Sequence, residues 1–265
     1  MRTVAGRPDA ADTNALVDEI CAGLRAGDGV IAMTGAGASA EAGIRPFRAP
    51  GNRGWLWSGI GACGVFLAGT GFAWSWWPWI ARFFYYYFFK RSVDNARPTS
   101  CHAFFANEGA PAITTNVDGL HEAAGSAPDR VAAIHGTVHR EMCNRCGSTS
   151  LPCCGVPRPA VLFFADAIRN DVVGEAHNCA NRIAVHPKRK TWVFVVGVSW
   201  AIPSFFPFLI RIRSPGVRVV HVNIDAPPTG YFAEGDTWVR EPSAYFFTLL
   251  EIQRARDRAR EKWAL

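Results

Sequence analysis

Two histidines and two cysteines stand in the twelve-residue stretch HGTVHREMCNRC, which runs from His135 to Cys146. Imidazole and thiolate groups are the usual ligands of zinc, and a histidine can also act as a general base near neutral pH. A histidine directly after a buried strand can equally be a hydrogen-bonded structural residue. From this stretch alone, His135 is a metal ligand, a catalyst or a structural residue, and His139 is most simply part of a surface loop.

Four of the eight cysteines lie within twelve residues, and this clustering favours a metal site over disulfides. Cys143 and Cys146 form a C-x2-C pair, the spacing that structural zinc sites use. Their partners would be Cys153 and Cys154, although adjacent cysteines chelate one ion with poor geometry. We predict a structural zinc ion on these four residues, with the second pair as the weaker half.

Two further stretches place glycines or polar residues after predicted strands. In TGAGAS, Gly35 and Gly37 would let the backbone approach a pyrophosphate, but a tight turn needs glycine even without a ligand. In TTNVDGLH, Asn116 and Asp118 would either meet a ligand at the sheet edge or cap the next helix through an Asx turn. Both interpretations stay open for each stretch.

The strands that must position these residues are short apolar runs without in-out alternation. They are predicted at 30–34 and near residues 111, 131, 160, 191 and 217. Helix-length segments lie between or beside them, at 13–26, 167–183, 202–212 and 243–263. Continuous apolar strands separated by helices indicate a parallel sheet covered on both faces. The predicted fold class is α/β, a Rossmann-like doubly wound sheet.

Two segments do not fit this alternation and are predicted to form a smaller domain beside the sheet. They are a helical, aromatic insert at 50–104 and a zinc-ribbon-like cysteine module at 137–157. The Rossmann-like domain would then comprise residues 1–49, 105–136 and 158–265. Within the insert, residues 55–81 contain no charged side chain, yet five glycines and little Leu, Ile or Val favour an apolar lid over a membrane span.

Composition narrows the class of partner. The net charge is +6, but the 28 Lys and Arg residues are scattered and form no run, so we expect no specific nucleic-acid partner. The N-terminal stretch lacks the apolar core of a signal peptide, which predicts a cytoplasmic protein with reduced thiols. The oligomeric state is not predicted.

In their order and separations, these motifs resemble those of the sirtuin family of NAD-dependent protein deacylases. The resemblance spans most of residues 13–240. The stretches that carry it are GAGASAEAGIRPFR at 35–48, ARPTSCHAFF at 96–105, TTNVDGLHEAAGS at 114–126, IHG at 134–136, CNRC with CCG, RPAVLFFAD at 158–166, VVGVSWAIP at 195–203 and VNID at 222–225.

The resemblance implies that the chain consumes NAD to remove acyl groups from lysines of a protein or peptide, giving nicotinamide and O-acyl-ADP-ribose. It implies catalytic roles for His135, as general base on a ribose hydroxyl, and for Asn116 and Asp118 at the nicotinamide. The NAD contacts that it implies are Gly35, Ala36, Gly37, Ser39, Phe47, Arg48, Thr115, Asn116, Asp118, Gly197, Ser199 and Asn223. The substrate contacts are Tyr85, Phe164, Ala165 and Asp166.

Several residues depart from the family's pattern. Thr115 replaces a glutamine, Ala42 and Arg45 replace a serine and a proline, Val198 replaces a threonine, and Phe164-Ala165-Asp166 replaces Phe-Gly-Glu. Two alternatives to deacylation stay open, and the altered cofactor loop together with the basic pI favours the second of them. One is protein ADP-ribosyl transfer, and the other is a non-catalytic NAD-binding or interaction module.

The aromatic insert bears on the acyl group. Family members that remove acidic acyl groups carry a Tyr-x-x-Arg pair, whereas here Tyr85 is followed by Phe88 at the position of the arginine. A pocket without that cation would bury the acyl carboxylate unpaired, which is costly. We therefore predict that acetyl or longer apolar acyl groups are preferred.

Overall fold

The computed structural model describes residues 2–5, 10–44, 78–162, 172–185, 189–199 and 204–263. Its strands are β1 (Arg2–Ala5), β2 (Gly29–Thr34), β3 (Ala112–Thr114), β4 (Val131–Ala133), β5 (Gly136–Cys143), β6 (Pro157–Val161), β7 (Thr191–Val196), β8 (Val217–Val222) and β9 (Thr237–Arg240). Its α-helices are α1 (Ala10–Arg25), α4 (Pro78–Tyr85), α5 (Arg91–Asn95), α6 (Ser100–Asn107), α7 (Leu120–Ala123), α8 (Val172–Ile183), α9 (Phe206–Ile212) and α10 (Ser243–Trp263). The 3₁₀ helices are η1 (Ala36–Ala42), η4 (Pro128–Arg130) and η5 (Thr229–Tyr231), and η3 (Tyr86–Lys90) is a turn of π-helix.

Seven of the described strands form one sheet in the order β1-β9-β8-β7-β2-β3-β4. Every neighbouring pair is parallel. In β2 and β7 every residue is buried, which is why both read as unbroken apolar runs. The predicted α/β fold with a doubly wound parallel sheet is confirmed.

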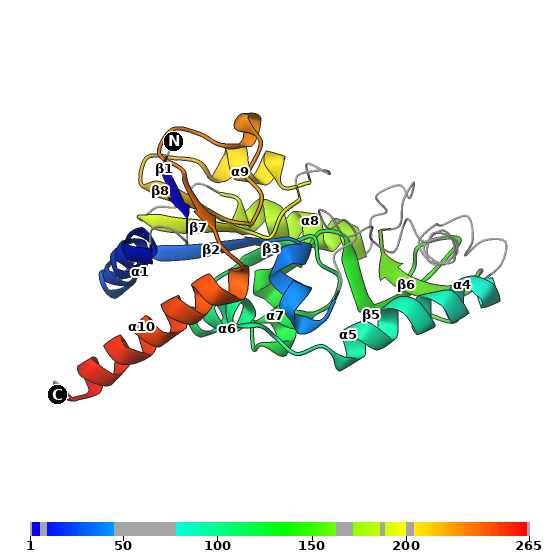
Figure 1. Ribbon diagram of the computed structural model, residues 1–265. Helices are drawn as coiled ribbons and strands as arrows, with labels where there is room; N and C mark the ends of the chain where they lie inside the picture. Colours follow the sequence, from blue (N-terminus) through cyan, green and yellow to red (C-terminus); the bar gives the residue numbers. More distant parts are fainter. Residues whose placement is uncertain are drawn as a thin grey trace.

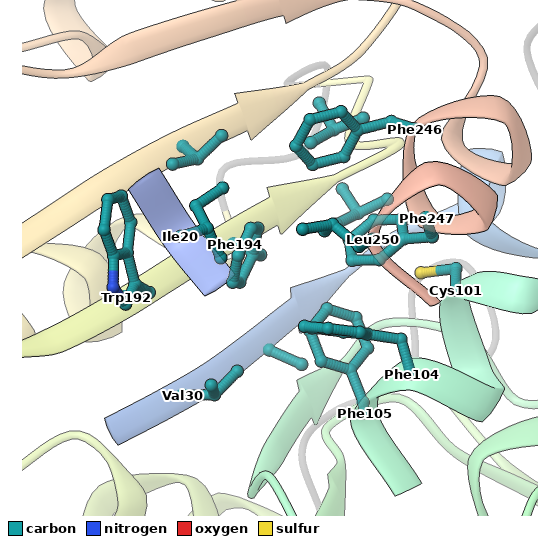
Figure 2. Close-up of a cluster of buried hydrophobic side chains, with 14 of the residues drawn as sticks. Ile20, Val30, Cys101, Phe104, Phe105, Trp192, Phe194, Phe246, Phe247 and Leu250 are labelled. Carbon is teal, nitrogen blue, oxygen red and sulfur yellow. The ribbon is translucent and has the colours of Figure 1, made fainter. Parts of the chain in front are cut away.

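Helices cover both faces of this sheet (Figure 1). On one face, α1, α6 and α10 bury an aromatic core that includes Phe104, Phe194 and Phe247 (Figure 2). The Phe194 ring centroid lies 5.9 Å from that of Phe104 and 5.6 Å from that of Phe247. On the other face, α8 and α9 pack against a second core that includes Met33 and Val195. Successive residues of β7 therefore enter opposite cores, as the alternation of side chains along a strand requires.

A smaller region lies beside the sheet and contains α4, η3, α5 and the two-stranded sheet of β5 and β6 (Figure 1). Its core includes Tyr85, Val93, Val138 and Val161. The strand expected near residue 160 was assigned to the parallel sheet, and this was wrong, because β6 pairs antiparallel with β5. The chain turns back at the cysteine cluster between Cys143 and Pro157, so β6 runs opposite to β5 and pairs with it outside the parallel sheet.

Three strands of the structure, β1, β5 and β9, were not predicted from the sequence. The expected boundary of the insert at residue 104 falls inside α6, whose Phe104 and Phe105 belong to the main aromatic core. Among the described helices, none is both long and apolar enough to cross a membrane. The predicted apolar lid at 55–81 lies largely outside the described residues, which omit 55–77.

Candidate active site

The residues singled out by their motifs follow five neighbouring strands at one edge of the sheet. Gly35 follows β2, Asn116 follows β3, His135 follows β4, Gly197 follows β7 and Asn223 follows β8. These strands are adjacent in the order β8-β7-β2-β3-β4, and all run in the same direction. Their carboxyl ends therefore meet at one edge, which is where open α/β sheets bind ligands.

The glycine loop, residues 35–43, packs directly on the loop after β7. The amide of Gly35 donates to the carbonyl of Val196, and the amide of Gly37 donates to that of Gly197, each over 2.9 Å. A Cβ on Gly37 would lie 2.5 Å from the Cα of Gly197, which itself has a φ of +62°. Glycine is needed here because two backbones touch, so this requirement holds whether or not a ligand is bound.

Three polar side chains from separate elements hold the carbonyls of the glycine loop. Asn116 donates its amide to the Gly35 carbonyl over 3.0 Å and to the buried Ser39 hydroxyl over 2.9 Å. The Thr99 hydroxyl donates to the Ala38 carbonyl, and the Ser243 hydroxyl donates to the Gly37 carbonyl. The loop is thus anchored to β3, to the start of α6 and to the start of α10.

Asp118 is buried and forms a turn at the start of α7. Its Oδ1 accepts the amide of Leu120 over 3.0 Å, which is the Asx-turn arrangement. Its carbonyl lies 2.9 Å from Nε2 of His139. His139 is exposed, as expected, but it belongs to the strand β5 and not to a loop, and its ring connects β5 to the segment after β3. A strand was missed there because its register is irregular between Thr137 and Glu141.

His135 is half-buried and is held through its ring and its backbone. Its Nε2 lies 3.1 Å from the hydroxyl of Ser204. Burial lowers the pKa of His135 and the nearby His177 lowers it further, while a hydrogen bond to the backbone of Thr115 opposes them. The His135 carbonyl accepts the amide of Leu162, so the chain after β6 passes directly beside the histidine. A neutral imidazole at this edge is suited to general-base chemistry.

The residues expected at the adenosine side also lie at this edge. Asn223 donates its side-chain amide to the Val198 carbonyl over 2.8 Å, and its own carbonyl accepts the indole N–H of Trp238. Ser199 is exposed beside them. Five predicted site residues lie outside the described residues: Phe47, Arg48, Phe164, Ala165 and Asp166.

A pair of buried histidines next to the glycine loop was not predicted. His121 Nε2 lies 2.8 Å from the hydroxyl of Thr34, and His102 Nδ1 accepts the amide of Thr99 over 3.2 Å. Burial lowers the pKa of His102 to about 4, although Asp118 opposes it. Burial and the neighbouring His102 lower the pKa of His121 to about 3. The spacing of Thr99 and His102, three residues apart at the start of α6, is a sequence signal for the contact between these two residues.

Tyr85 lines a pocket of about 400 Å³ between α4 and the β5-β6 sheet. Burial raises the pKa of its phenol, and the acids Asp94 and Glu141 raise it further. Two cations also line this pocket: Arg82 lies 3.5 Å from Glu141, and Lys90 pairs with Asp94. Each cation of the pocket thus has an acidic partner within the protein.

The four clustered cysteines converge at the turn between β5 and β6. The sulfurs of Cys143, Cys146, Cys153 and Cys154 all lie within 4.8 Å of one another. Tetrahedral zinc with bonds of about 2.3 Å separates its sulfurs by about 3.8 Å, which is the distance between Cys143 and Cys154. The adjacent cysteines reach different partners: Cys154 approaches Cys143, whereas Cys153 approaches Cys146 to 3.2 Å, which is shorter than the tetrahedral separation.

Neighbouring groups shift the pKa values of these thiols in opposite directions. Hydrogen bonds from the backbone amides of Cys146 and Arg145 lower the pKa of Cys143 to about 6, whereas the sulfurs of Cys146 and Cys143 raise the pKa of Cys154 to about 12. Four thiolates this close repel one another unless a dication balances them. The donor set therefore fits structural zinc, with Cys143, Cys146, Cys153 and Cys154 as the residues that would hold it.

Comparisons with known proteins agree with this geometry. The Sir2 family profile matches residues 35–200. The chain is 32% identical to an NAD-dependent protein deacylase of Aeropyrum pernix, over 82% of this chain and 88% of the relative. It is 27% identical to NAD-dependent protein deacylase 2 of Pyrobaculum aerophilum, over 89% and 94%. A solved complex of a Sir2 homologue with NAD aligns with a TM-score of 0.63 and 26% identity, covering 86% of this chain and 90% of that one.

Proposed function

The chain belongs to the Sir2 family, and on this premise we propose that it is an NAD-dependent protein-lysine deacylase that forms nicotinamide and O-acyl-ADP-ribose. The observation that carries the proposal is the convergence of Gly35, Asn116 and His135 at the carboxyl ends of three adjacent parallel strands. These residues come from three motifs that are far apart in the sequence, and all three belong to the span matched by the family profile.

The site residues fit NAD. Both amide hydrogens of Asn116 are used by Gly35 and Ser39, so its Oδ1 is oriented as an acceptor for a ligand amide. Asp118 uses one carboxylate oxygen on Leu120, and the other can accept from the same ligand. Ala36 and Ser39 would meet the phosphates and ribose beside the glycine loop, and Gly197, Ser199 and Asn223 would line the adenosine. Bound NAD would supply the nicotinamide leaving group and the ribose that receives the acyl group.

His135 acts as the general base in this proposal. Its lowered pKa keeps the ring neutral at physiological pH, so a ring nitrogen can take the proton of a ribose hydroxyl. Its place beside the end of β6 supports a peptide substrate next to it, because the Leu162 amide already bonds the His135 carbonyl. The family resemblance assigns contacts with an acyl-lysine peptide to Phe164, Ala165 and Asp166, which lie outside the described residues.

We also propose a preference for uncharged acyl groups. Tyr85 lines the pocket, and the two cations beside it, Arg82 and Lys90, are paired with Glu141 and Asp94. An acidic acyl group would have to compete with those acids for a cation.

The zinc site of the four cysteines would be structural and would stabilise the turn between β5 and β6. The free thiols of Cys21, Cys101 and Cys179 support a reducing compartment, and we propose the cytoplasm.

Mass spectrometry of an acetyl-lysine peptide incubated with the protein and NAD tests the proposal. We expect the wild-type protein to produce the deacetylated peptide together with O-acetyl-ADP-ribose. The variant His135→Ala should produce neither. A gain of ADP-ribose on the peptide or the protein would instead identify an ADP-ribosyltransferase. An unchanged peptide despite measurable NAD binding would identify a non-catalytic module.

A further inference from the structure

The hydroxyl of Ser204 contacts the ring nitrogen Nε2 of His135, and no sequence motif indicated this contact. Ser204 is half-buried, it lies two residues before α9, and its hydroxyl stands 3.1 Å from Nε2 of His135. The two residues are 69 positions apart in the chain. The contact therefore depends on the fold, which brings the start of α9 to the carboxyl end of β4.

The two hydrogen bonds of the His135 ring determine where its proton resides. One bond is to the backbone of Thr115 and raises the pKa of the ring, so the ring donates it to a carbonyl, which can only accept. A neutral imidazole carries a single N–H. With Nε2 directed at Ser204, a bond from Nδ1–H to Thr115 would leave the lone pair on Nε2, where it can accept the Ser204 hydroxyl.

We infer that Ser204 is a positioning residue for the deacylation reaction, which holds His135 in the tautomer that has its proton on Nδ1 and its lone pair on Nε2. This inference rests on the proposed function, in which His135 takes a proton from a ribose hydroxyl. Thr115 and Ser204 hold the ring from two sides, so Nε2 keeps its direction until the ribose hydroxyl takes the place of the Ser204 hydroxyl on its lone pair. Without the hydroxyl the ring can rotate and exchange tautomers.

Nitrogen-15 NMR of the histidine side chains tests the tautomer without any turnover. At a pH where His135 is neutral, the wild-type protein should show a protonated Nδ1 and an unprotonated Nε2, assigned by loss of these signals in His135→Gln. Ser204→Ala should give averaged shifts for the two nitrogens, and Ser204→Thr, which keeps the hydroxyl, should restore the wild-type pattern. A proton on Nε2 in the wild-type protein would overturn the inference.

Steady-state kinetics test whether the contact serves the reaction. Ser204→Ala should lower kcat about tenfold, less than the loss expected for a missing general base, with little change in either KM. Ser204→Thr should recover most of kcat. The matched control is Ser214→Ala, since Ser214 is also half-buried and flanks the other end of α9. An unchanged kcat in Ser204→Ala, or an equal loss in Ser214→Ala, would overturn the inference. An inactive wild-type protein with the expected NMR pattern would contradict the proposed function alone.

Discussion

The ring of His102 stands edge-on to the ring of His121, with their centroids 4.8 Å apart. Both rings are buried, and each is bonded to a residue that leads into or holds the glycine loop. His102 Nε2 and His121 Nδ1 have no hydrogen-bond partner among the described residues. A proton added to either ring would place a charge in this buried contact, and Asp118 would offset it only in part at His102.

Mild acid should therefore destabilise the protein. The folded-state pKa values of about 4 and about 3 lie below the ordinary value of 6.5, so the unfolded chain binds protons first as the pH falls. The free energy of unfolding should be constant above pH 6.5 and decrease below it, by at least about 2 kcal/mol near pH 4.5. Urea unfolding across this range measures the change. The same slope in the double variant His102→Gln, His121→Gln would contradict this origin.

Gly37→Ala should weaken NAD binding and lower the melting temperature. The added Cβ would lie 2.5 Å from the Cα of Gly197, so the two loops must separate, at a cost of roughly 2 kcal/mol. Calorimetric titration with NAD and thermal unfolding measure both effects. Gly230→Ala is the control, because a Cβ at Gly230 has no atom within 4 Å and should change neither quantity. Equal NAD affinities and melting temperatures in the two variants would show that the contact between Gly37 and Gly197 supports neither NAD binding nor stability.

Removal of the metal should unfold the β5-β6 hairpin. We expect one zinc ion per chain by elemental analysis and its loss in Cys146→Ser, because the other three sulfurs cannot complete the tetrahedron. A strong chelator should lower the melting temperature of the wild-type protein. Cys179→Ser, which changes a cysteine outside the cluster, should retain the metal. Metal-free protein with an unchanged melting temperature in chelator would refute a structural zinc site.

Asp236→Asn should cost about 3 kcal/mol of stability, since a buried charge pair loses one partner. Arg213 donates to both oxygens of Asp236, over 2.8 and 2.6 Å, and His221 lies 3.2 Å away. Burial alone would raise the pKa of Asp236, but the bonds from Arg213 and His221 lower it to about 2. Its contribution to stability is therefore present above pH 3.8 and disappears as the pH falls towards 2.

The exposed pair of Lys90 and Asp94 provides the control for Asp236, because Asp94 is 42% exposed. Asp94→Asn should change the free energy of unfolding by under about 1 kcal/mol, as is usual for surface ion pairs. Urea unfolding of both variants at neutral pH gives the comparison. Similar losses of unfolding free energy in Asp236→Asn and Asp94→Asn would mean that burial does not strengthen the Asp236 contacts.

The acyl preference can be measured with peptides that have the same sequence and differ only in the acyl group on the lysine. We expect acetyl and longer apolar acyl-lysine peptides to have a higher kcat/KM than the succinyl peptide, because Arg82 and Lys90 are held by acids of the protein. In Glu141→Gln the freed Arg82 should narrow the difference. A wild-type protein that hydrolyses the succinyl peptide faster than the acetyl peptide would refute the preference.

The sequence by itself determined the parallel sheet and the set of chemical groups at its edge. Apolar runs such as TWVFVV have no polar face, so the strand that they form must be covered on both sides. The motifs after β2, β3 and β4 follow their strands within a few residues, and parallel strands bring such positions together. The clustering of cysteines likewise indicated a metal before any distance was known.

Only the tertiary structure decided which side chains hold those groups in place. Ser243 bonds the carbonyl of Gly37 across 206 residues, and Ser204 reaches His135 across 69, so no local spacing encodes either contact. The pairing of β6 with β5 and the convergence of the adjacent cysteines also depend on how the chain turns back. Hydrophobic periodicity determines the elements because it acts over a few residues, whereas a single hydrogen bond depends on where the packed elements finally stand.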